Sequence, residues 1–134
     1  MIAPLMVLDT SALLALLLDE PEAEGFRGAM EDDTTRLVSA ATLLETALVI
    51  EARKGEPGGR ELDALIHKAE VVVVAVDADQ ESEARRAYRR FGKGRHAAGL
   101  NFGDVFAYAL ARATGEPLLF KGEDFARTDV GRVR

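Results

Sequence analysis

Short apolar runs that alternate with longer, helix-like stretches constrain the fold of this chain more than any other feature. The runs lie at residues 5–8, 37–38, 71–76 and 118–120, and the segments between them are predicted to be helices. Short buried strands that alternate with helices are typical of a parallel sheet covered by helices. The sequence therefore predicts an α/β fold with a parallel sheet. Its 134 residues are expected to form a single domain, 1–134.

Turn and cap residues predict where the helices begin and end. Thr10 or Ser11 can cap a helix after the first run, and the glycine- and proline-rich stretch 55–59 is expected to separate two later helices. Asp77 is expected to end the strand at 71–76 and to cap a charged helix. The expected helices after the first one are 22–31, 40–54, 60–69, 78–91 and 103–114.

Four acidic residues lie inside or beside strongly apolar segments, at the boundaries of these elements. Asp9 directly follows the first run, and Asp124 lies just past the last one. Glu45 and Asp104 lie in the first turns of predicted helices. The binding crevice of a parallel sheet lies beyond the carboxyl ends of its strands, so this spacing permits all four to converge. Ionised carboxylates in apolar surroundings need a neutralising partner, and divalent cations prefer oxygen ligands.

Each acid also has a purely structural interpretation. Asp9 can form a turn at a strand end, and Glu45 completes a capping box that begins at Thr42. Asp104 suits the third position of a capped helix, where an acid favours the helix dipole, and Asp124 can cap a final turn. Taken singly these interpretations hold, but together they require four coincidental acids at one sheet edge.

Composition excludes several other kinds of site. The chain has no cysteine, which removes disulfides, thiolate zinc sites and cysteine nucleophiles. This fits a reducing compartment, and we expect a cytoplasmic protein. The apolar start has no basic segment before it, and no stretch is long enough to span a bilayer, so we expect no signal peptide and no membrane association.

Other catalytic patterns fit less well. His67 and His96 lie in charged helix and loop sequence and are better explained as surface residues than as a base or a metal ligand. The nucleotide-binding glycine motifs and the G-x-S-x-G motif of serine hydrolases do not occur. Haloacid-dehalogenase-like phosphatases need a second Asp where this chain has Ser11, and receiver domains need an acid pair where Asp9 stands alone.

Four segments together resemble one known family. They are VLDTSALLALLLDEPEA, LLETALV, FGKGRHAAGLNFGDVFAYALA and LLFKGEDFARTDV. Their order and spacing resemble the PIN-domain ribonucleases, specifically the VapC toxins of bacterial toxin–antitoxin pairs. The resemblance implies a three-layer α/β/α sandwich with a central parallel sheet. It also implies that Asp9, Glu45, Asp104 and Asp124 form a pocket for Mg²⁺ or Mn²⁺, with Asp9 and Asp104 as the direct ligands.

The same resemblance assigns supporting residues and partners. Thr10 or Ser11 would order the pocket, and Thr128 and Asp129 match a terminal T-D pair. Asp129 would either add to the metal site or pack its rim. The implied partners are an RNA substrate, a cognate VapB-like antitoxin whose segment covers the pocket, and a second copy of the chain in a homodimer.

The implied reaction is metal-dependent hydrolysis of an RNA phosphodiester. An acidic pocket repels RNA, so a basic rim is needed. Residues 85–96 carry six Lys/Arg and no acid, whereas the rest of the chain holds 11 basic and 23 acidic residues. The candidates are Arg85, Arg86, Arg89, Arg90, Lys93 and Arg95, and of these Arg86, Arg90, Lys93 and Arg95 are the predicted RNA-binding set. A solvated helix face is the structural alternative. At the level of function, the alternative is a non-catalytic protein-binding module whose acids are structural.

Overall fold

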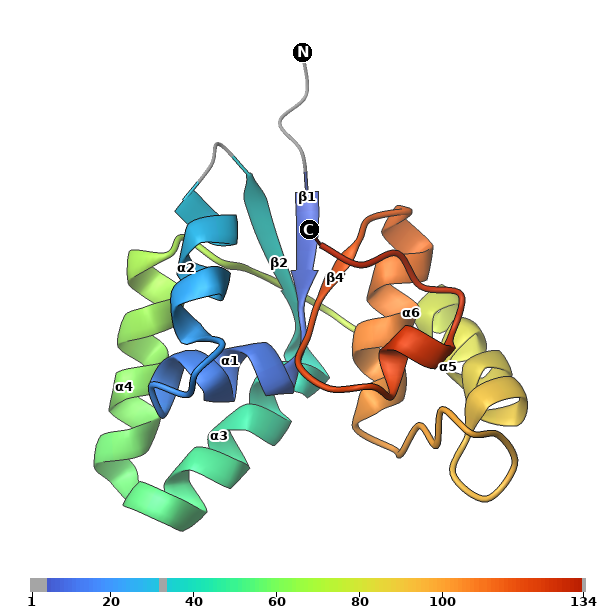
Figure 1. Cartoon of the computed structure of the whole chain (residues 1–134), viewed down its shortest axis with the longest axis horizontal. Coiled ribbons are helices and arrows are strands. Elements are labelled where there is room, and N and C mark those ends of the chain that lie inside the picture. The colour runs from blue at the N-terminus through green and yellow to red at the C-terminus, as the bar shows by residue number, and fades with distance from the viewer. Residues whose placement is uncertain (1–4, 32–33, 134) are drawn as a thin grey trace.

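A parallel sheet of four strands, with helices on both of its faces, forms the centre of the described part of the chain (Figure 1). The computed structural model describes residues 5–31 and 34–133, so residues 1–4, 32–33 and 134 of the predicted domain 1–134 lie outside it. The strand order is β3-β2-β1-β4, and every pairing is parallel. The strands are β1 (Leu5–Leu8), β2 (Thr35–Ser39), β3 (Val72–Val74) and β4 (Leu118–Leu119).

The helices form two layers, one on each side of the sheet. The helices are α1 (Thr10–Leu17), α2 (Ala23–Glu31), α3 (Ala40–Lys54), α4 (Glu56–Lys68), α5 (Ala78–Phe91) and α6 (Asp104–Thr114), followed by the short 3₁₀ helix η1 (Phe125–Arg127). Figure 1 shows α1 to α4 on one side and α5 and α6 on the other. This arrangement confirms the predicted three-layer α/β/α sandwich. No helix in residues 5–31 and 34–133 combines the length and apolarity that crossing a membrane requires.

The alternation of side chains along β1 explains the two layers. Met6 and Leu8 pack into one core cluster with residues of α1 and α2, whereas Val7 packs into the other with residues of α5 and α6. Successive strand residues point to opposite faces, so a wholly apolar strand is buried on both. The continuous apolar run at residues 5–8 is the sequence signature of this central position.

The order of the strands reverses at β1. Val7 pairs with Leu37 of β2 on one side and with Leu118 of β4 on the other. The chain therefore builds the sheet outward from β1 first on the β2 side and later on the β4 side. In open α/β sheets such a reversal opens a crevice at the carboxyl ends of the strands. Asp9 is the first residue after β1 and therefore lies at this point.

The boundary between α3 and α4 differs from the prediction. Residues 55–59 were expected to separate the two helices, but only Gly55 lies between them and α4 begins at Glu56. Pro57 occupies the first turn of α4, where a missing N–H has no cost. A Cβ on Gly58 would lie 2.8 Å from the carbonyl oxygen of Ile50, so this glycine lets α4 pack closely against α3.

The predicted strand at 71–76 is shorter than expected. The run of valines indicated the clearest strand of the chain, yet β3 covers only Val72–Val74 and lies at the edge of the sheet. It pairs with β2 alone, and Val72 and Val73 remain exposed. The valine content predicts a strand but not its place in the sheet, because edge and central positions depend on the other strands.

Candidate functional site

Asp9 is a buried carboxylate with one oxygen that has no hydrogen-bond partner. The residue is 3% exposed. Its Oδ2 accepts hydrogen bonds from the backbone N–H of Ser11 (2.9 Å) and from the Ser11 hydroxyl (2.6 Å). The bond from the backbone N–H makes Asp9 the N-cap of α1. Oδ1 is buried and unpartnered among the described residues. Burial raises the pKa of Asp9 and the charge of Glu45 adds to the rise, although the Ser11 bonds oppose it.

Thr10 and Ser11 hold the first two acids in place. The Thr10 hydroxyl donates to Oε1 of Glu45 at 2.6 Å, and the Ser11 hydroxyl accepts from the backbone N–H of Lys121 at 2.9 Å. Ser11 therefore joins Asp9 to the segment that follows β4. This geometry agrees with the supporting role that the sequence suggested for both hydroxyls.

Glu45 does not form the capping box that was its structural alternative. α3 begins at Ala40, and Ser39 caps it by accepting from the backbone N–H of Ala41. Glu45 therefore lies in the second turn, past the position that a capping box requires. Its carboxylate rests against Gly103, where a Cβ would come within 1.7 Å of Oε2. Glu45 thus lies directly at the start of α6.

Asp104 has both a structural role and an electrostatic one. Its Oδ2 accepts from the backbone N–H of Asn101, and its own N–H donates to Oδ1 of Asn101, both at 2.9 Å. This reciprocal pair fixes the turn before α6, as the capping interpretation expected. Burial nevertheless raises the pKa of Asp104 to about 6 despite the Asn101 bond, and the charges of Asp9, Glu45 and Asp124 contribute to the rise.

Asp124 comes from the segment that follows β4. It directly precedes η1, but its side chain makes no capping hydrogen bond, so the structural interpretation of Asp124 is wrong. Its charge instead acts on Asp104. The charges of Asp9, Glu45 and Asp124 thus all act on the carboxylate of Asp104, and we call these four residues the four-acid site.

Thr128 and Asp129 take part in other contacts. The Thr128 hydroxyl donates to the carbonyl of Phe125 at 2.7 Å and closes η1. Asp129 accepts from the Tyr108 hydroxyl and lies 3.3 Å from Arg90 and 3.9 Å from Arg112. Burial and this bond raise the pKa of Tyr108. Two guanidinium groups thus offset the charge of Asp129. This favours a role for Asp129 at the rim of the pocket over a role as a metal ligand.

The donor set of the four-acid site suits a hard divalent cation. Carboxylate oxygens are the ligands that Mg²⁺ and Mn²⁺ prefer. The unpartnered Oδ1 of Asp9 is a buried anionic oxygen for which the described protein atoms supply no donor. As placed, however, no three His, Cys, Asp or Glu side chains in residues 5–31 and 34–133 are close enough to cage a metal. Thr10 bonds to Glu45, and the backbone N–H of Asn101 donates to Asp104.

The basic segment divides into paired and unpaired residues. Arg85 pairs with Glu81 and Arg86 with Glu83, both on the same helix, and Arg90 pairs with Asp129. Within the described part of the chain, no ion pair involves Lys93 or Arg95. The guanidinium of Arg95 lies 6.0 Å from the ring centroid of Tyr88. The pairing of Arg85 and Arg86 favours a solvated helix face for those two residues.

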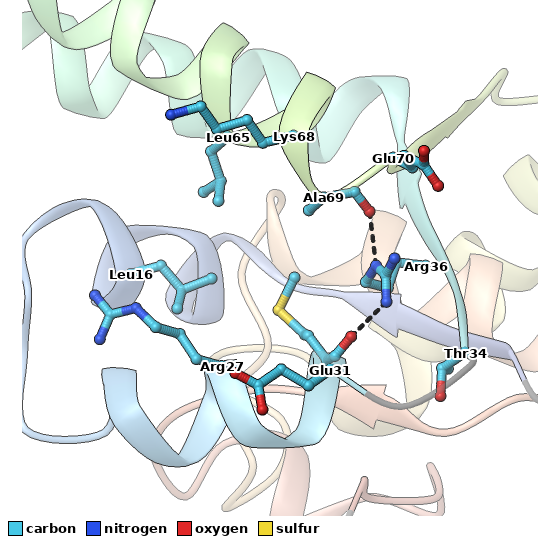
Figure 2. Close-up of a pocket in the computed structure, with 10 residues that line it drawn as sticks. Leu16, Arg27, Glu31, Thr34, Arg36, Leu65, Lys68, Ala69 and Glu70 are labelled. Carbon is cyan, nitrogen blue, oxygen red and sulfur yellow. Dashed lines mark hydrogen bonds between the residues drawn. The ribbon is translucent and has the colours of Figure 1, made fainter.

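A separate cavity of about 830 Å³ lies in the layer formed by α1, α2 and α4, away from the four acids (Figure 2). Arg36 of β2 crosses it, donating through Nε to the carbonyl of Ala69 at 2.8 Å and through a terminal nitrogen to the carbonyl of Met30. These bonds tie β2 to the ends of α2 and α4. The contacts of Arg36 with the surrounding main chain therefore explain it as a structural residue.

Sequence reasoning missed three residues of the site. Gly103 is one, because a glycine directly before a predicted helix gives no sign that a distant carboxylate rests on it. Thr46, whose hydroxyl donates to Thr10 at 3.2 Å, is another. Phe102, 77% exposed, is the third. The sequence shows a phenylalanine two residues before a candidate ligand, but the exposure of its ring is a property of the fold.

Comparison with known proteins places this geometry in a family. The PIN domain model matches residues 6–131. A protein named Ribonuclease VapC from Mycolicibacterium smegmatis is 65% identical over 128 residues, covering 96% of this chain and 99% of the relative. The crystal structure of Mycobacterium tuberculosis VapC20, described as a sarcin-ricin loop cleaving toxin, aligns with a TM-score of 0.78 at 21% identity, covering 96% and 98% of the two chains. VapBC2 from Rickettsia felis, bound to a DNA fragment from its promoter, aligns at 0.75 and 14% identity over 97% of both chains.

Proposed function

The chain belongs to the PIN domain family and, within it, to the VapC ribonucleases, and on that premise we propose that it is the endoribonuclease toxin of a toxin–antitoxin pair. The proposed reaction is hydrolysis of RNA phosphodiester bonds, with Mg²⁺ or Mn²⁺ held at the four-acid site. The observation that carries this proposal is the buried Oδ1 of Asp9, which has no hydrogen-bond partner among the described residues and whose carboxyl group is repelled by other acids of the site.

Two of the acids are proposed to hold the metal. Asp9 offers its free Oδ1 while Ser11 fixes Oδ2, and Asp104 offers a carboxylate whose negative charge is disfavoured when no cation is bound. A bound divalent ion supplies a water of lowered pKa and stabilises charge on the phosphate oxygens. The carboxylates repel one another, and a divalent ion bound between them would offset this repulsion, which favours its binding there.

Glu45 and Asp124 are proposed to orient the attacking water or to complete the shell around the metal. Thr10 fixes Oε1 of Glu45, which leaves Oε2 as an acceptor on the side of Gly103 and Asp104. A carboxylate held by a hydroxyl in this way keeps one orientation, and fixed orientation is what a water-positioning group needs. Asp124 has no capping bond that would compete with such a role.

RNA approaches an acidic crevice only if basic groups attract it. We assign this role first to Lys93 and Arg95, which carry no ion pair among the described residues, and then to Arg86 and Arg90, whose charges Glu83 and Asp129 partly offset. The magnitude of such attraction depends on counterion release and falls as salt rises.

Two protein partners belong to the same proposal. A VapB-like antitoxin would bind over the crevice and block it. A second copy of the chain would form a homodimer, and size-exclusion chromatography with light scattering measures that state directly. The alternative function is a non-catalytic protein-binding module, which predicts partner binding without any metal-dependent cleavage of RNA.

The test of the enzyme proposal is cleavage of total cellular RNA by the purified protein with and without Mg²⁺ or Mn²⁺. Replacing a buried ligand charge while keeping its shape, as in Asp9→Asn, should lower the cleavage rate at least about 100-fold. Asp104→Asn should do the same. Asp63→Asn is the matched control, because Asp63 is an exposed acid of α4 far along the chain from the site, and it should cleave like the wild type.

Each result separates the possibilities. Wild-type cleavage that needs the ion and is lost in both site variants supports the proposal. An Asp9→Asn protein that cleaves at the wild-type rate would show that Asp9 is not a ligand. A wild-type protein that cleaves no RNA with either ion, yet binds an antitoxin, would favour the non-catalytic module.

A further inference from the structure

Phe102 exposes a large apolar ring beside the four-acid site. It is 77% exposed, more than any other large hydrophobic residue identified as exposed in the described chain. Only Gly103 separates it from Asp104, so the Cα atoms of residues 102 and 104 are at most about 7 Å apart. Exposing a phenylalanine to water forgoes the free energy that burial would supply, so a partner that covers the ring would gain it.

The ring is held in place by its neighbours. The reciprocal hydrogen bonds between Asn101 and Asp104 fix the turn that carries Phe102. The ring of Phe106, one turn into α6, meets the Phe102 ring edge to face, with centroids 5.1 Å apart and planes at 88°. An aromatic ring that is fixed before binding loses little conformational entropy when a ligand covers it.

An apolar hollow of about 400 Å³ lies beside this ring. It is lined by residues that come from α5, from α6 and from the segments before these helices. The apolar members include Val76, Tyr88, Phe102 and Phe106, and the ion pair between Arg85 and Glu81 lies among them. The guanidinium of Arg95 stands over the ring of Tyr88, so the basic loop borders the hollow.

We propose that Phe102 is a base-stacking residue: an unpaired nucleobase of single-stranded RNA lies on its ring and over the hollow, next to the phosphate that the four-acid site cleaves. This rests on the proposed ribonuclease function and names its substrate class. Bases of single strands stack on exposed aromatic side chains, while basic groups follow the backbone. The ring of Phe102 and the apolar hollow supply the surface on which a base stacks, and the adjacent basic loop supplies the cations that contact the RNA backbone.

Charge favours RNA over a second copy of the chain on this surface. A two-fold interface brings the same patch of both copies together, so two patches that each carry Lys93 and Arg95, without ion pairs among the described residues, would face each other. Like charges at close range oppose such an association. An RNA strand instead brings phosphates to these cations, and its bases meet the aromatic rings.

The experiment measures how much of the binding depends on the bases. Fluorescence anisotropy compares a single-stranded oligouridylate of about twelve nucleotides with an abasic strand of the same ribose-phosphate length. The protein carries Asp9→Asn to prevent cleavage. We expect the base-containing strand to bind roughly 5- to 150-fold more tightly, the range that loss of base–aromatic stacking gives. Phe102→Ala should remove most of this ratio and leave binding of the abasic strand unchanged.

Two further variants sharpen the result. Phe102→Trp keeps an aromatic face and should keep the ratio. Val73→Ala, which shortens an exposed apolar side chain on β3, is the matched control and should also keep it. Size-exclusion chromatography of Phe102→Ala shows whether the ring contacts a second copy instead.

The outcomes separate this inference from the proposed function. A ratio near one in the parent protein, or an unchanged ratio in Phe102→Ala, overturns base stacking even if the wild type cleaves RNA. A Phe102→Ala protein that loses its dimer but keeps the ratio assigns the ring to self-association and also overturns it. If the wild type cleaves no RNA with Mg²⁺ or Mn²⁺, the ribonuclease proposal fails and base stacking at a cleavage site fails with it.

Discussion

At the scale of single residues, Asp104 combines two roles that oppose each other energetically. Its carboxylate accepts the Asn101 N–H and so stabilises the start of α6. The same carboxylate is partly buried beside Asp9, Glu45 and Asp124, which raises its pKa to about 6. The protein therefore keeps a destabilising charge where a cation would remove the strain, which is the pattern expected of a functional site.

Asp104→Asn should stabilise the metal-free protein near neutral pH. A carboxyl whose folded-state pKa is raised from 3.8 to about 6 holds its proton more tightly when folded, so its contribution to stability is present at low pH and is lost as pH rises through about 6. The amide removes this loss and can still accept the Asn101 bond. We expect a gain of roughly 1 kcal/mol after allowing for solvent screening, or about 4 °C in Tm.

Thermal unfolding in chelator, at about pH 5 and about pH 7, measures the effect. Asp63→Asn is the control and should follow the wild type at both values. An Asp104→Asn protein that melts below the wild type at the higher pH would show that the carboxylate is needed as a cap more than it is opposed as a charge.

The sequence singled out the four acids because they stand at strand ends or near predicted helix starts, and the carboxyl ends of parallel strands share one edge of a sheet. It could not place Asp129. The partner of Asp129 on α5, Arg90, is 39 positions away, and such pairing depends on how α5 and the C-terminal segment pack. The contact of Glu45 with Gly103 was hidden for the same reason, since it joins α3 to the start of α6.

At the scale of elements, α5 and the loop after it carry the densest cluster of basic residues, six Lys/Arg within residues 85–96, but these residues do not act alike. The sequence left Arg85 and Arg86 among the candidates for a basic rim. In the structure each has an acid of its own helix within reach, at Glu81 and Glu83. Such i, i+3 and i, i+4 pairs are weak but lower the net charge of the face. The loop residues have no such neighbours among the pairs found.

Replacing Lys93 and Arg95 by Gln should weaken RNA binding more than replacing Arg86. If both loop residues contact phosphates, the double variant should reduce the slope of log K against log salt by about 1.4, at about 0.7 per contact with single-stranded RNA. Arg86→Gln should change it by less than half of that, because Glu83 already offsets its charge. Anisotropy over a salt series in the Asp9→Asn background measures both slopes.

Equal slopes for the double variant and the wild type would return the loop to the solvated-surface interpretation. The boundaries of α5 were easier to predict from the sequence than the pairing of its charges. The helix from Ala78 to Phe91 was predicted closely, because Asp77 caps it and its apolar face is regular. Which of its charges are paired depends on rotamers, and no periodic pattern contains that information.

At the scale of the whole molecule, the order of the strands creates the site. β1 lies between β2 and β4, so Asp9 emerges at the point where the chain changes direction, and the elements carrying the other three acids surround it. The parallel sheet could be predicted from alternating apolar runs. The position of each strand could not, because Val72–Val74 is as apolar as β1 but lies at the edge. The family resemblance supplied the layer arrangement that periodicity did not.

A divalent cation should stabilise the whole fold through this one crevice. Binding to the native state alone, at about 100-fold above Kd, adds about 2.7 kcal/mol to the free energy of unfolding, or roughly 10 °C in Tm for a domain of this size. Protons compete for the same oxygens, so the gain should grow between about pH 5 and about pH 7, while the metal-free protein becomes less stable over that range. Thermal unfolding with Mg²⁺, Mn²⁺ or chelator measures this gain.

The Tm of a variant with amides at all four acids should not rise with the cation. An Asp63→Asn, Asp79→Asn control, with two exposed acids removed, should show the full rise. If the Tm of the four-amide variant rose with the cation as much as that of the wild type, the cation would be binding at another place, because the four carboxylates are absent from that variant.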